Sequence, residues 1–405
     1  MQEFKGFRVE LYPTNEQVQQ LIEHCNSSVY AHNWAWSTYT DYYKETGMVL
    51  SPNKLCQLFT RFKNDKSQPK YEWLHSFGTE HLRISVRNLA KDFNKTFKMR
   101  RAGKKIGGKL PNFPKLIRKK DRHRHPFFFT RKDRIIIYDD RISFQDFTDR
   151  DNNSIKMKKH NIPIGRNYEY CDPHISCDKC GRWWFSCQLK FKNPIKLNKA
   201  EHQSEAIGID LGIKNFVTLS DGRTFNYPTK KLKRLIKRRT KLANKFRKRC
   251  INLKKQTKAK SEYDVPISKN MHKLNLKRQK LDNKIKNIRK NTRYKIANIL
   301  IKENPKAIVM EGLNVTNMMH HKGIHKDVHY SGFYDMKCIL KYKCDWYDID
   351  FIEADPFFPS SKKCSKCGNI KNNLKLNDRV YVCDACGAVI DRDVNAAINL
   401  KKLAY

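Results

Sequence analysis

Residues Cys364–Ala397, CSKCGNIKNNLKLNDRVYVCDACGAVIDRDVNAA, hold two kinds of chemistry in one short segment. Four cysteines form two CxxC pairs, Cys364 with Cys367 and Cys383 with Cys386. A glycine follows each pair, and it lets the backbone turn so that both thiolates of a pair face one ion. Four cysteines with this spacing are typical of a tetrahedral structural zinc site. The alternative, four unrelated buried thiols, rarely shows paired spacing with glycines.

Two acids, Asp391 and Asp393, follow the second cysteine pair, and the stretch 394–397, VNAA, comes directly after them. This pattern predicts an acid at the start of a short helix whose small residues let it lie close against a sheet. One of the two acids is expected to cap the amino terminus of that helix. The other is then a candidate for chemistry.

The bulk composition indicates a folded chain that binds a large polyanion. The 405 residues suffice for two or three domains. Lysine and arginine number 84 against 40 acids, and the net charge of +44 would repel itself strongly without a neutralising partner. Nucleic acid is the expected partner. A membrane surface is the rival, but the charge spreads along the whole chain and no apolar run reaches the ~20 residues of a membrane span.

The cysteine content indicates a reducing compartment. The chain has 13 cysteines, and those outside the two CxxC pairs are irregularly spaced. The first residues, MQEFKGFRVELYP, contain no signal-peptide core. We therefore expect a cytoplasmic protein.

The amino-terminal half predicts one strand, a helical region and then a set of strands. Phe7–Tyr12 alternates like a strand, and a helical region follows from Thr14 to Met99. Its stretch 26–47 is rich in Tyr and Trp, which form either a helix core or a surface on which bases stack. The stretch 126–192 resembles a small antiparallel barrel, which we expect the opening strand to close. The helical region is thus expected to interrupt the barrel domain.

A cysteine-rich turn lies near the end of that strand region, with Cys171, Cys177, Cys180 and Cys187. A second metal site is one interpretation. The simpler one is a hairpin tip at 178–181 without a metal.

Two further acids each follow an apolar strand and precede a glycine: Asp210 in AIGIDLG and Glu311 in AIVMEG. Together with Asp393 they form the set that an RNase H-like nuclease needs, in which two divalent ions about 4 Å apart clamp the scissile phosphate. Carboxylates suit Mg²⁺. The motif GIDLG also resembles the phosphate-binding turn of sugar-kinase, actin and chaperone ATPases, but the further glycine-rich loops of those proteins are absent.

Residues 229–300 predict a pair of long basic helices. Apolar residues recur at helical spacing, and lysine and arginine crowd the other faces with almost no acids among them. We expect this pair to contact phosphates rather than to be a merely solvated charged hairpin. The residues expected to make these contacts are Lys230, Lys231, Arg234, Arg238, Arg239, Arg247, Arg249 and Lys254.

From end to end, the sequence resembles the TnpB (OrfB-type) transposon-encoded, RNA-guided DNA nucleases. The matching stretches, in family order, are FRVELYPTNEQ, GRWWFSCQLKF, AIGIDLGIKNFVTLSDG, IVMEGLNVTNM, LKYKCDWYDIDFIEADPFFPSSKKCSKCG and CDACGAVIDRDVNAAINL. Miniature type V CRISPR effectors share the same RuvC and zinc motifs and are the nearest alternative.

The resemblance implies an α/β multidomain protein. A wedge-like β-barrel would comprise residues 1–13 and 100–195, with a helical recognition domain at 14–99. An RNase H-like (RuvC) nuclease domain would span 205–363, interrupted by a zinc-bearing, target-nucleic-acid-binding insert at 364–390. It would resume at 391–405.

The resemblance also implies the site residues and the partners. Asp210, Glu311 and Asp393 would bind two Mg²⁺ ions, since the family's third acid directly precedes x-Asn-Ala-Ala. The four cysteines of the CxxC pairs would bind one structural Zn²⁺. A monomer with a guide RNA would find target DNA beside a short motif and cut it by hydrolysis, leaving a 3′ hydroxyl. A prokaryotic, nucleoid-associated location is implied.

Two other functions compete with guided cleavage. A non-cleaving RNA-guided binding protein would be expected to lack one of the three acids, and all three are present. A transposase that joins strands also uses three acids. The zinc insert inside the acid series, and the lack of an obvious strand-transfer module, argue against it.

Overall fold

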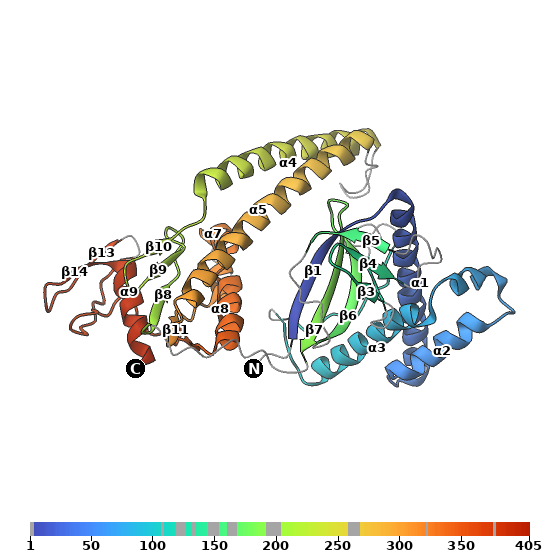
Figure 1. Cartoon of the computed structure of the whole chain (residues 1–405), viewed down its shortest axis with the longest axis horizontal. Coiled ribbons are helices and arrows are strands. Elements are labelled where there is room, and N and C mark those ends of the chain that lie inside the picture. The colour runs from blue at the N-terminus through green and yellow to red at the C-terminus, as the bar shows by residue number, and fades with distance from the viewer. Residues whose placement is uncertain are drawn as a thin grey trace. The chain divides into compact units, whose positions relative to one another are not determined.

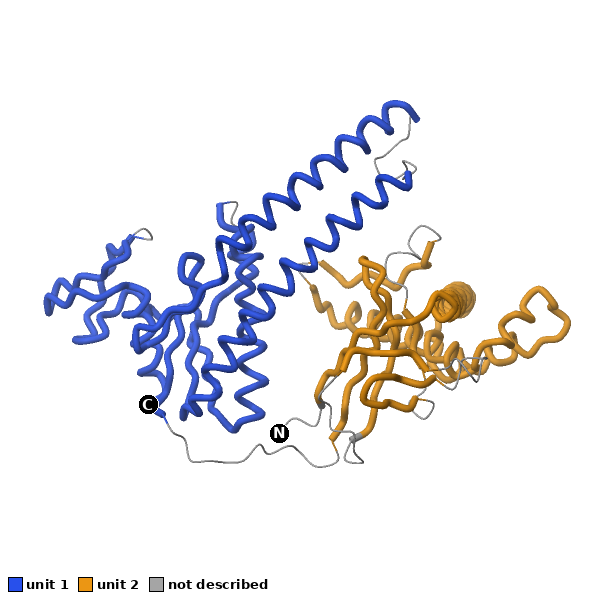
Figure 2. Tube along the Cα trace, turned by 45° about the horizontal axis from the view of Figure 1, so that its top comes forward, with its two compact units in different colours: residues 1–2, 194–405 blue, residues 3–193 orange. Residues whose placement is uncertain are grey.

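The computed structural model describes residues 4–106, 109–118, 127–130, 135–144, 154–159, 168–191, 204–257, 268–320, 323–375 and 378–405. The chain divides into two compact units, one of residues 3–193 and one of residues 194–405 with the first two residues (Figure 2). Each unit is described here by itself. Among the described residues, no helix combines the length and the apolar character that a membrane crossing requires. Residues 192–203, where one unit ends and the other begins, lie outside the described residues.

The amino-terminal unit contains a seven-stranded antiparallel sheet in the order β2-β6-β7-β1-β5-β4-β3 (Figure 1). Its strands are β1 (Phe4–Tyr12), β2 (Phe127–Phe129), β3 (Ile135–Ile137), β4 (Arg141–Phe144), β5 (Ser154–Met157), β6 (Tyr168–Cys177) and β7 (Trp183–Phe191).

The expectation of a barrel closed by the opening strand is wrong for the described residues. β1 lies in the middle of the sheet, where Phe4 to Leu11 pair with β7, and Leu11 and Tyr12 pair with β5. β2 and β3 form the two edges, and no described residues pair one edge with the other. One face of β1 is buried through Val9 and Leu11, so alternation predicted the strand but not its neighbours.

Helices flank this sheet in the same unit: α1 (Asn15–Thr46), α2 (Pro52–Asn64), the 3₁₀ helix η1 (Pro69–Ser76) and α3 (Thr79–Arg101). Thr14 begins α1 with a capping box, in which its hydroxyl accepts from the Gln17 backbone and the Gln17 side chain accepts from the Thr14 backbone. Leu21 and Cys25 of α1 pack into the core of the sheet.

Most aromatic side chains of α1 belong to a helical core. Trp34 stacks on Phe62 with ring centroids 5.2 Å apart, and Tyr39 stacks on Phe93 at 4.4 Å. Tyr39 and Phe93 are buried. These aromatic residues of the stretch 26–47 therefore form part of a helix core rather than a surface for stacking bases.

The carboxy-terminal unit contains a five-stranded sheet in the order β10-β9-β8-β11-β12. Its strands are β8 (Ile207–Asp210), β9 (Val217–Leu219), β10 (Thr224–Phe225), β11 (Ala307–Met310) and β12 (Asp350–Glu353). β8, β11 and β12 run parallel to one another, β9 runs antiparallel to β8, and β10 runs antiparallel to β9. The three parallel strands therefore end at the same edge of the sheet.

The remaining elements of this unit connect or cover the sheet: α4 (Thr229–Thr257), α5 (Lys269–Lys302), α6 (Val315–His320), α7 (His325–Ser331), α8 (Phe333–Tyr347), β13 (Val380–Val382), β14 (Val389–Asp391), α9 (Arg392–Lys401) and η4 (Lys402–Ala404). The carboxy-terminal part of α5 joins α7, α8 and the strands in one core. The long helices α4 and α5 continue beyond that core as a pair (Figure 1).

The last helix, α9, lies directly on β8 without side chains between the two backbones. A Cβ atom on Gly208 would come within 2.6 Å of the Lys401 nitrogen and closer still to the Ala397 carbonyl oxygen. Ala396 and Ala397 are fully buried on the helix side of this contact. The small residues that the sequence placed after Asp393 thus do bring the helix close to the sheet.

We expect Gly208→Ala to destabilise the carboxy-terminal unit by about 1–3 kcal/mol, because the added methyl group would overlap the backbone of α9. Urea unfolding followed by tryptophan fluorescence and circular dichroism measures this change. Gly6→Ala is the matched control, since a Cβ atom on Gly6 in β1 would meet nothing within 4 Å. Equal stability of the two variants would contradict the direct contact between α9 and β8.

Candidate active site and metal centre

Two of the predicted acids lie side by side at the carboxyl edge of the parallel strands. Asp210 is the last residue of β8, and Glu311 directly follows β11. The register pairs Ile209 with Met310, so the next residues, Asp210 and Glu311, are level on neighbouring strands. Adjacent parallel strands lie about 4.8 Å apart. The two carboxylates are therefore neighbours because of strand register.

The two acids before the VNAA stretch have separate roles. Asp391 is the amino-terminal cap of α9, and its carboxylate accepts hydrogen bonds from the backbone nitrogens of Asp393 and Val394 at 2.9 and 3.1 Å. Asp393 lies in the first turn of the helix. Because Asp391 is occupied by capping, Asp393 remains the candidate for chemistry.

Electrostatics place Asp393 close to the acids on the strands. Burial, and then the negative charges of Glu311 and Asp393, raise the pKa of Asp210 well above its ordinary value. Burial likewise raises the pKa of Glu311, while the guanidinium of Arg392 lowers it. Like charges held together in a partly buried site favour a bound cation that offsets their repulsion.

The four cysteines of the two CxxC pairs come together in space. Their sulfur atoms all lie within 4.8 Å of one another. The Sγ atoms of Cys364 and Cys386 are 3.7 Å apart, and those of Cys367 and Cys383 are 3.5 Å apart. Tetrahedral zinc with Zn–S bonds of about 2.3 Å requires sulfur separations of about 3.8 Å. The geometry therefore fits a metal ion bound by four thiolates.

The backbone around the cysteines prepares them for such an ion. Gly368 and Gly387 adopt positive φ angles of 79° and 67°. The backbone N–H of each glycine donates a hydrogen bond to the carbonyl oxygen of the first cysteine of its pair. The backbone nitrogen of Cys386 is the main cause that lowers the pKa of Cys383 to about 6. A thiol of this pKa is largely ionised at neutral pH, and the thiolate is the form that binds metal.

Two asparagines join the cysteine segment to the acid-bearing helix, and the sequence analysis missed this role. Asn395 accepts a hydrogen bond from the Ser365 nitrogen at 2.8 Å and donates to the Lys363 carbonyl at 2.8 Å. Asn399 donates to the carbonyls of Ser360 and Lys363. Both side chains are almost completely buried. Two asparagines one helical turn apart were the available signal, since this spacing places both on one face of α9.

The cysteine-rich turn of the amino-terminal unit is a hairpin held by an acid. The carboxylate of Asp178 accepts from the backbone nitrogens of Cys180 and Arg182 and from the indole of Trp184. Cys187 is buried in the core of the sheet. Among the described residues, the cluster of metal-binding side chains contains only the four cysteines of the CxxC pairs. The structure therefore does not gather Cys171, Cys177, Cys180 and Cys187 into a metal site.

The basic residues predicted to contact phosphates lie on α4, which contains no acidic residue. Most of them are exposed. Arg239 and Lys254 are half-buried, and Arg239 forms an ion pair with Asp282 of α5 at 2.8 Å. Leu232 and Cys250 of α4 are buried, so α4 has one apolar side and a large cationic surface.

Three family models match separate parts of this chain. Residues 1–48 match an OrfB-type model described as "Helix-turn-helix domain", residues 186–322 match the OrfB model described as "Probable transposase", and residues 333–400 match a "Cas12f1-like, TNB domain". In these parts the chain is similar to TnpB (OrfB)-type proteins and to Cas12f1. The second and third matches contain all three acids and all four cysteines of the candidate site.

Relatives of this chain are found in bacteria. A Streptomyces pristinaespiralis protein named "Putative RNA-guided DNA endonuclease" is 31% identical over 238 residues, which cover 59% of this chain and 54% of the relative. The Escherichia coli K12 protein "Putative RNA-guided DNA endonuclease InsQ" is 22% identical, with 99% of this chain and 92% of the relative covered. The match thus spans about half of the first relative and nearly all of the second.

A solved structure supports the fold of this chain. The protein in a cryo-EM structure of a Cas12f1–sgRNA–target DNA complex superposes with a TM-score of 0.51, 15% identity and 98% coverage of both chains. At this identity the likeness concerns the fold alone. The "Helix-turn-helix" description of residues 1–48 does not match the structure, where they form strand β1 and the single helix α1.

We expect Cys364→Ser to abolish zinc binding and to unfold the cysteine segment, because the segment has little core of its own besides the metal site. Mass-spectrometric metal analysis should find about one zinc ion per wild-type chain and almost none in the variant. Limited proteolysis should cut the variant within 364–390. Cys338→Ser is the matched control, since Cys338 is an exposed thiol on α8. Full zinc content in Cys364→Ser would refute the site.

Proposed function

We propose that this chain is an RNA-guided DNA endonuclease of a transposon. The observation that carries the proposal is the convergence of Asp210, Glu311 and Asp393 at one sheet edge in a chain similar to TnpB (OrfB)-type proteins. The parallel strands with an acid-bearing helix across them correspond to a RuvC-type, RNase H-like nuclease domain. The names of the Streptomyces and Escherichia relatives support the same activity.

The three carboxylates have the chemistry to hold two Mg²⁺ ions. The acids come from separate elements, and burial, followed by the charges of Glu311 and Asp393, raises the pKa of Asp210. Bound there, divalent cations would neutralise the scissile phosphate and lower the pKa of a water molecule. The protein positions Asp210 and Glu311 by strand register and Asp393 by the contact of α9 with β8. Arg392, next to Asp393, offsets part of the negative charge when no substrate is bound.

The cysteine segment is proposed to hold one structural Zn²⁺ and to bind target nucleic acid. Asn395 and Asn399 hold it against α9. The segment ends three residues before Asp393 in the chain. This connection would place bound DNA near the three acids.

A guide RNA is the proposed permanent partner, and the working particle is a monomeric ribonucleoprotein. A net charge of +44 requires a large polyanion, and α4 supplies a helix surface without acids. Pairing between guide and target would read the sequence, while the protein would read a short adjacent motif. The amino-terminal sheet and its helices are proposed as the wedge and recognition domains.

A miniature type V CRISPR effector is the second candidate, because residues 333–400 match a "Cas12f1-like, TNB domain". The two candidates share the chemistry and differ in where the guide is encoded. Sequencing the RNA that copurifies with the protein, expressed together with its flanking DNA, separates them. A structured RNA from beside the gene supports the transposon nuclease. A random mixture of RNA contradicts guided cleavage altogether.

We expect Asp210→Ala, Glu311→Ala and Asp393→Ala each to lower target cleavage at least 10³-fold while binding of guide and target persists, because each change removes an ionic ligand from the cluster. Gel analysis of cleaved plasmid and an electrophoretic mobility shift assay measure the two quantities. Asp345→Ala is the matched control, since Asp345 is an exposed acid on α8. Loss of binding in all three variants would mean that the acids are structural, and unchanged cleavage would exclude this site.

A further inference from the structure

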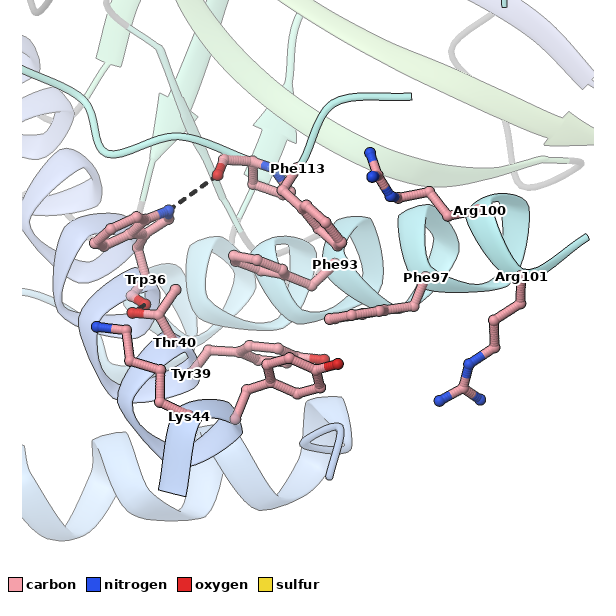
Figure 3. Close-up of a pocket in the computed structure, with 11 residues that line it drawn as sticks. Trp36, Tyr39, Thr40, Lys44, Phe93, Phe97, Arg100, Arg101 and Phe113 are labelled. Atoms are coloured by element: carbon pink, nitrogen blue, oxygen red, sulfur yellow. Dashed lines mark hydrogen bonds between the residues drawn. The ribbon is translucent and has the colours of Figure 1, made fainter. Parts of the chain in front are cut away.

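A cavity of about 500 Å³ opens in the amino-terminal unit. It lies between the last turns of α1, the last turns of α3 and the segment 113–114 (Figure 3). Its lining is mainly aromatic and basic, and it consists of Trp36, Tyr39, Thr40, Tyr43, Lys44, Phe93, Phe97, Arg100, Arg101, Phe113 and Pro114.

The aromatic walls of this cavity are held in place by one another. The rings of Tyr43 and Phe113 both contact the Phe97 ring, with centroids 4.8 and 4.7 Å from its centroid. The indole nitrogen of Trp36 donates to the Pro114 carbonyl at 2.9 Å, which fixes the segment 113–114 against α1. The cavity is therefore preformed, and its half-buried rings keep part of their surface accessible.

Three cations accompany these rings, from Lys44, Arg100 and Arg101. The Arg100 guanidinium lies 5.0 Å from the centre of the Phe113 ring and donates to the Pro111 carbonyl at 3.1 Å. Lys44 and Arg101 are exposed. An apolar ligand would need no such group of cations, whereas a nucleotide carries both a flat base and a negative phosphate.

We propose that this cavity, here called the aromatic pocket, binds one unpaired nucleotide of the guide RNA. The base stacks on the accessible faces of Tyr43 and Phe97, and its phosphates contact Arg100, Arg101 and Lys44. A volume of about 500 Å³ is within the range of small-ligand sites. The inference rests on the proposed function, because that function supplies the RNA.

Substitutions at Phe97 and Arg101 test the pocket. Phe97→Leu keeps apolar volume but removes the flat ring, so we expect about tenfold weaker binding of the copurifying RNA in a filter-binding assay, whereas Phe97→Tyr keeps wild-type affinity. Arg101→Gln is expected to weaken binding more than Lys54→Gln, which removes one exposed charge on α2 outside the pocket. Equal affinity of Phe97→Leu and Phe97→Tyr would overturn the proposal.

Ultraviolet crosslinking of the assembled particle locates the nucleotide. Peptide mass spectrometry should find RNA attached within 40–46 or 93–101, and Phe97→Leu should abolish that attachment. Crosslinks there only after target DNA is added would show that DNA occupies the pocket and would overturn the RNA assignment. Failure to purify any enriched RNA would instead refute the proposed function, so the two failures are distinguishable.

A second, independent feature lies at the edge where the acids meet. Phe357 follows β12 and is 93% exposed, although its neighbour Phe358 packs against the core of Val309, Ala354 and Leu400. The carboxylate of Asp355 accepts a hydrogen bond from the Phe357 nitrogen at 2.7 Å, and the Asp355 carbonyl accepts one from the Phe358 nitrogen at 3.0 Å. This turn holds the large apolar side chain of Phe357 in solvent.

The loop that carries Phe357 lies against the strand end that carries Glu311. Met310 pairs with Glu353, so Ala354 is level with Glu311 at the carboxyl edge. A Cβ atom on Gly312 would lie only 3.3 Å from the Pro356 nitrogen. Pro356, which precedes Phe357 in the chain, therefore lies against Gly312, which directly follows Glu311.

The geometry points to Phe357 as a positioning residue that stacks on a base of the DNA strand next to the scissile phosphate. An exposed aromatic ring is unfavourable in water and gains from stacking on a base. Stacking there would hold the strand so that its phosphate meets the three acids. This inference also rests on the proposed nuclease function.

We expect Phe357→Ala to lower the single-turnover cleavage rate about tenfold and to spread the cut positions, with guide and target binding unchanged. Phe357→Tyr should restore the rate and the position. The matched control is Ile299→Ala, because Ile299 is an exposed apolar residue near the end of α5. It is close in sequence to the start of β11, which lies at the opposite edge of the sheet from Glu311.

Abasic target DNA separates stacking from a structural role. An abasic site at the stacked nucleotide should slow the wild type to the rate of Phe357→Ala and leave that variant unaffected. A Phe357→Ala protein with wild-type rate and cut positions would overturn the assignment. Wild-type protein that cuts no target at all would refute the proposed function instead.

Discussion

The direct contact between the backbones of α9 and β8 is the constraint on which the candidate site depends. Gly208 leaves no side chain between helix and strand, and Ala397 lies against it. The contact holds α9 so that its first turn reaches the end of β8, where Asp210 stands beside Glu311. A larger residue at either side of the contact would move Asp393 away from the other two acids, because the position of Asp393 depends on this spacing.

The same helix also organises the cysteine segment. One end of α9 carries the capping Asp391 and the candidate Asp393, and its buried face carries Asn395 and Asn399, which bind the backbone at 360–365. Four thiols and two glycine turns then fold the segment around a metal-sized centre. A metal-binding segment and an acid cluster are thus attached to ten residues of helix. The cysteine segment and Asp393 depend on the same helix, which explains why they are adjacent in the sequence.

Acidic and basic side chains are distributed differently in the structure. The candidate catalytic acids are three residues of the carboxy-terminal unit, whereas lysine and arginine side chains are spread over exposed helix surfaces, as on α4. Aromatic rings accompany cations at the aromatic pocket, and one exposed ring, Phe357, accompanies the acids. Both arrangements suit nucleic acid, since it offers flat bases for stacking together with phosphates for ionic contact. Phosphates would meet cations over most of the surface and carboxylates only at the site of cleavage.

The sequence by itself determined the cysteine pairs and the basic helices and supplied the three candidate acids, because each of these features depends on the local spacing within its own segment. It also determined that Phe7–Tyr12 is a strand, through the alternation of its side chains. Only the tertiary structure decided that this strand lies in the middle of an open sheet, because its partners are more than 140 residues away and alternation carries no information about neighbours. Likewise, Asn395, Asn399 and Phe357 gained their roles only when α9 and the loop after β12 were placed on the sheet. Burial and proximity are properties of packing, and packing joins residues that the sequence keeps apart.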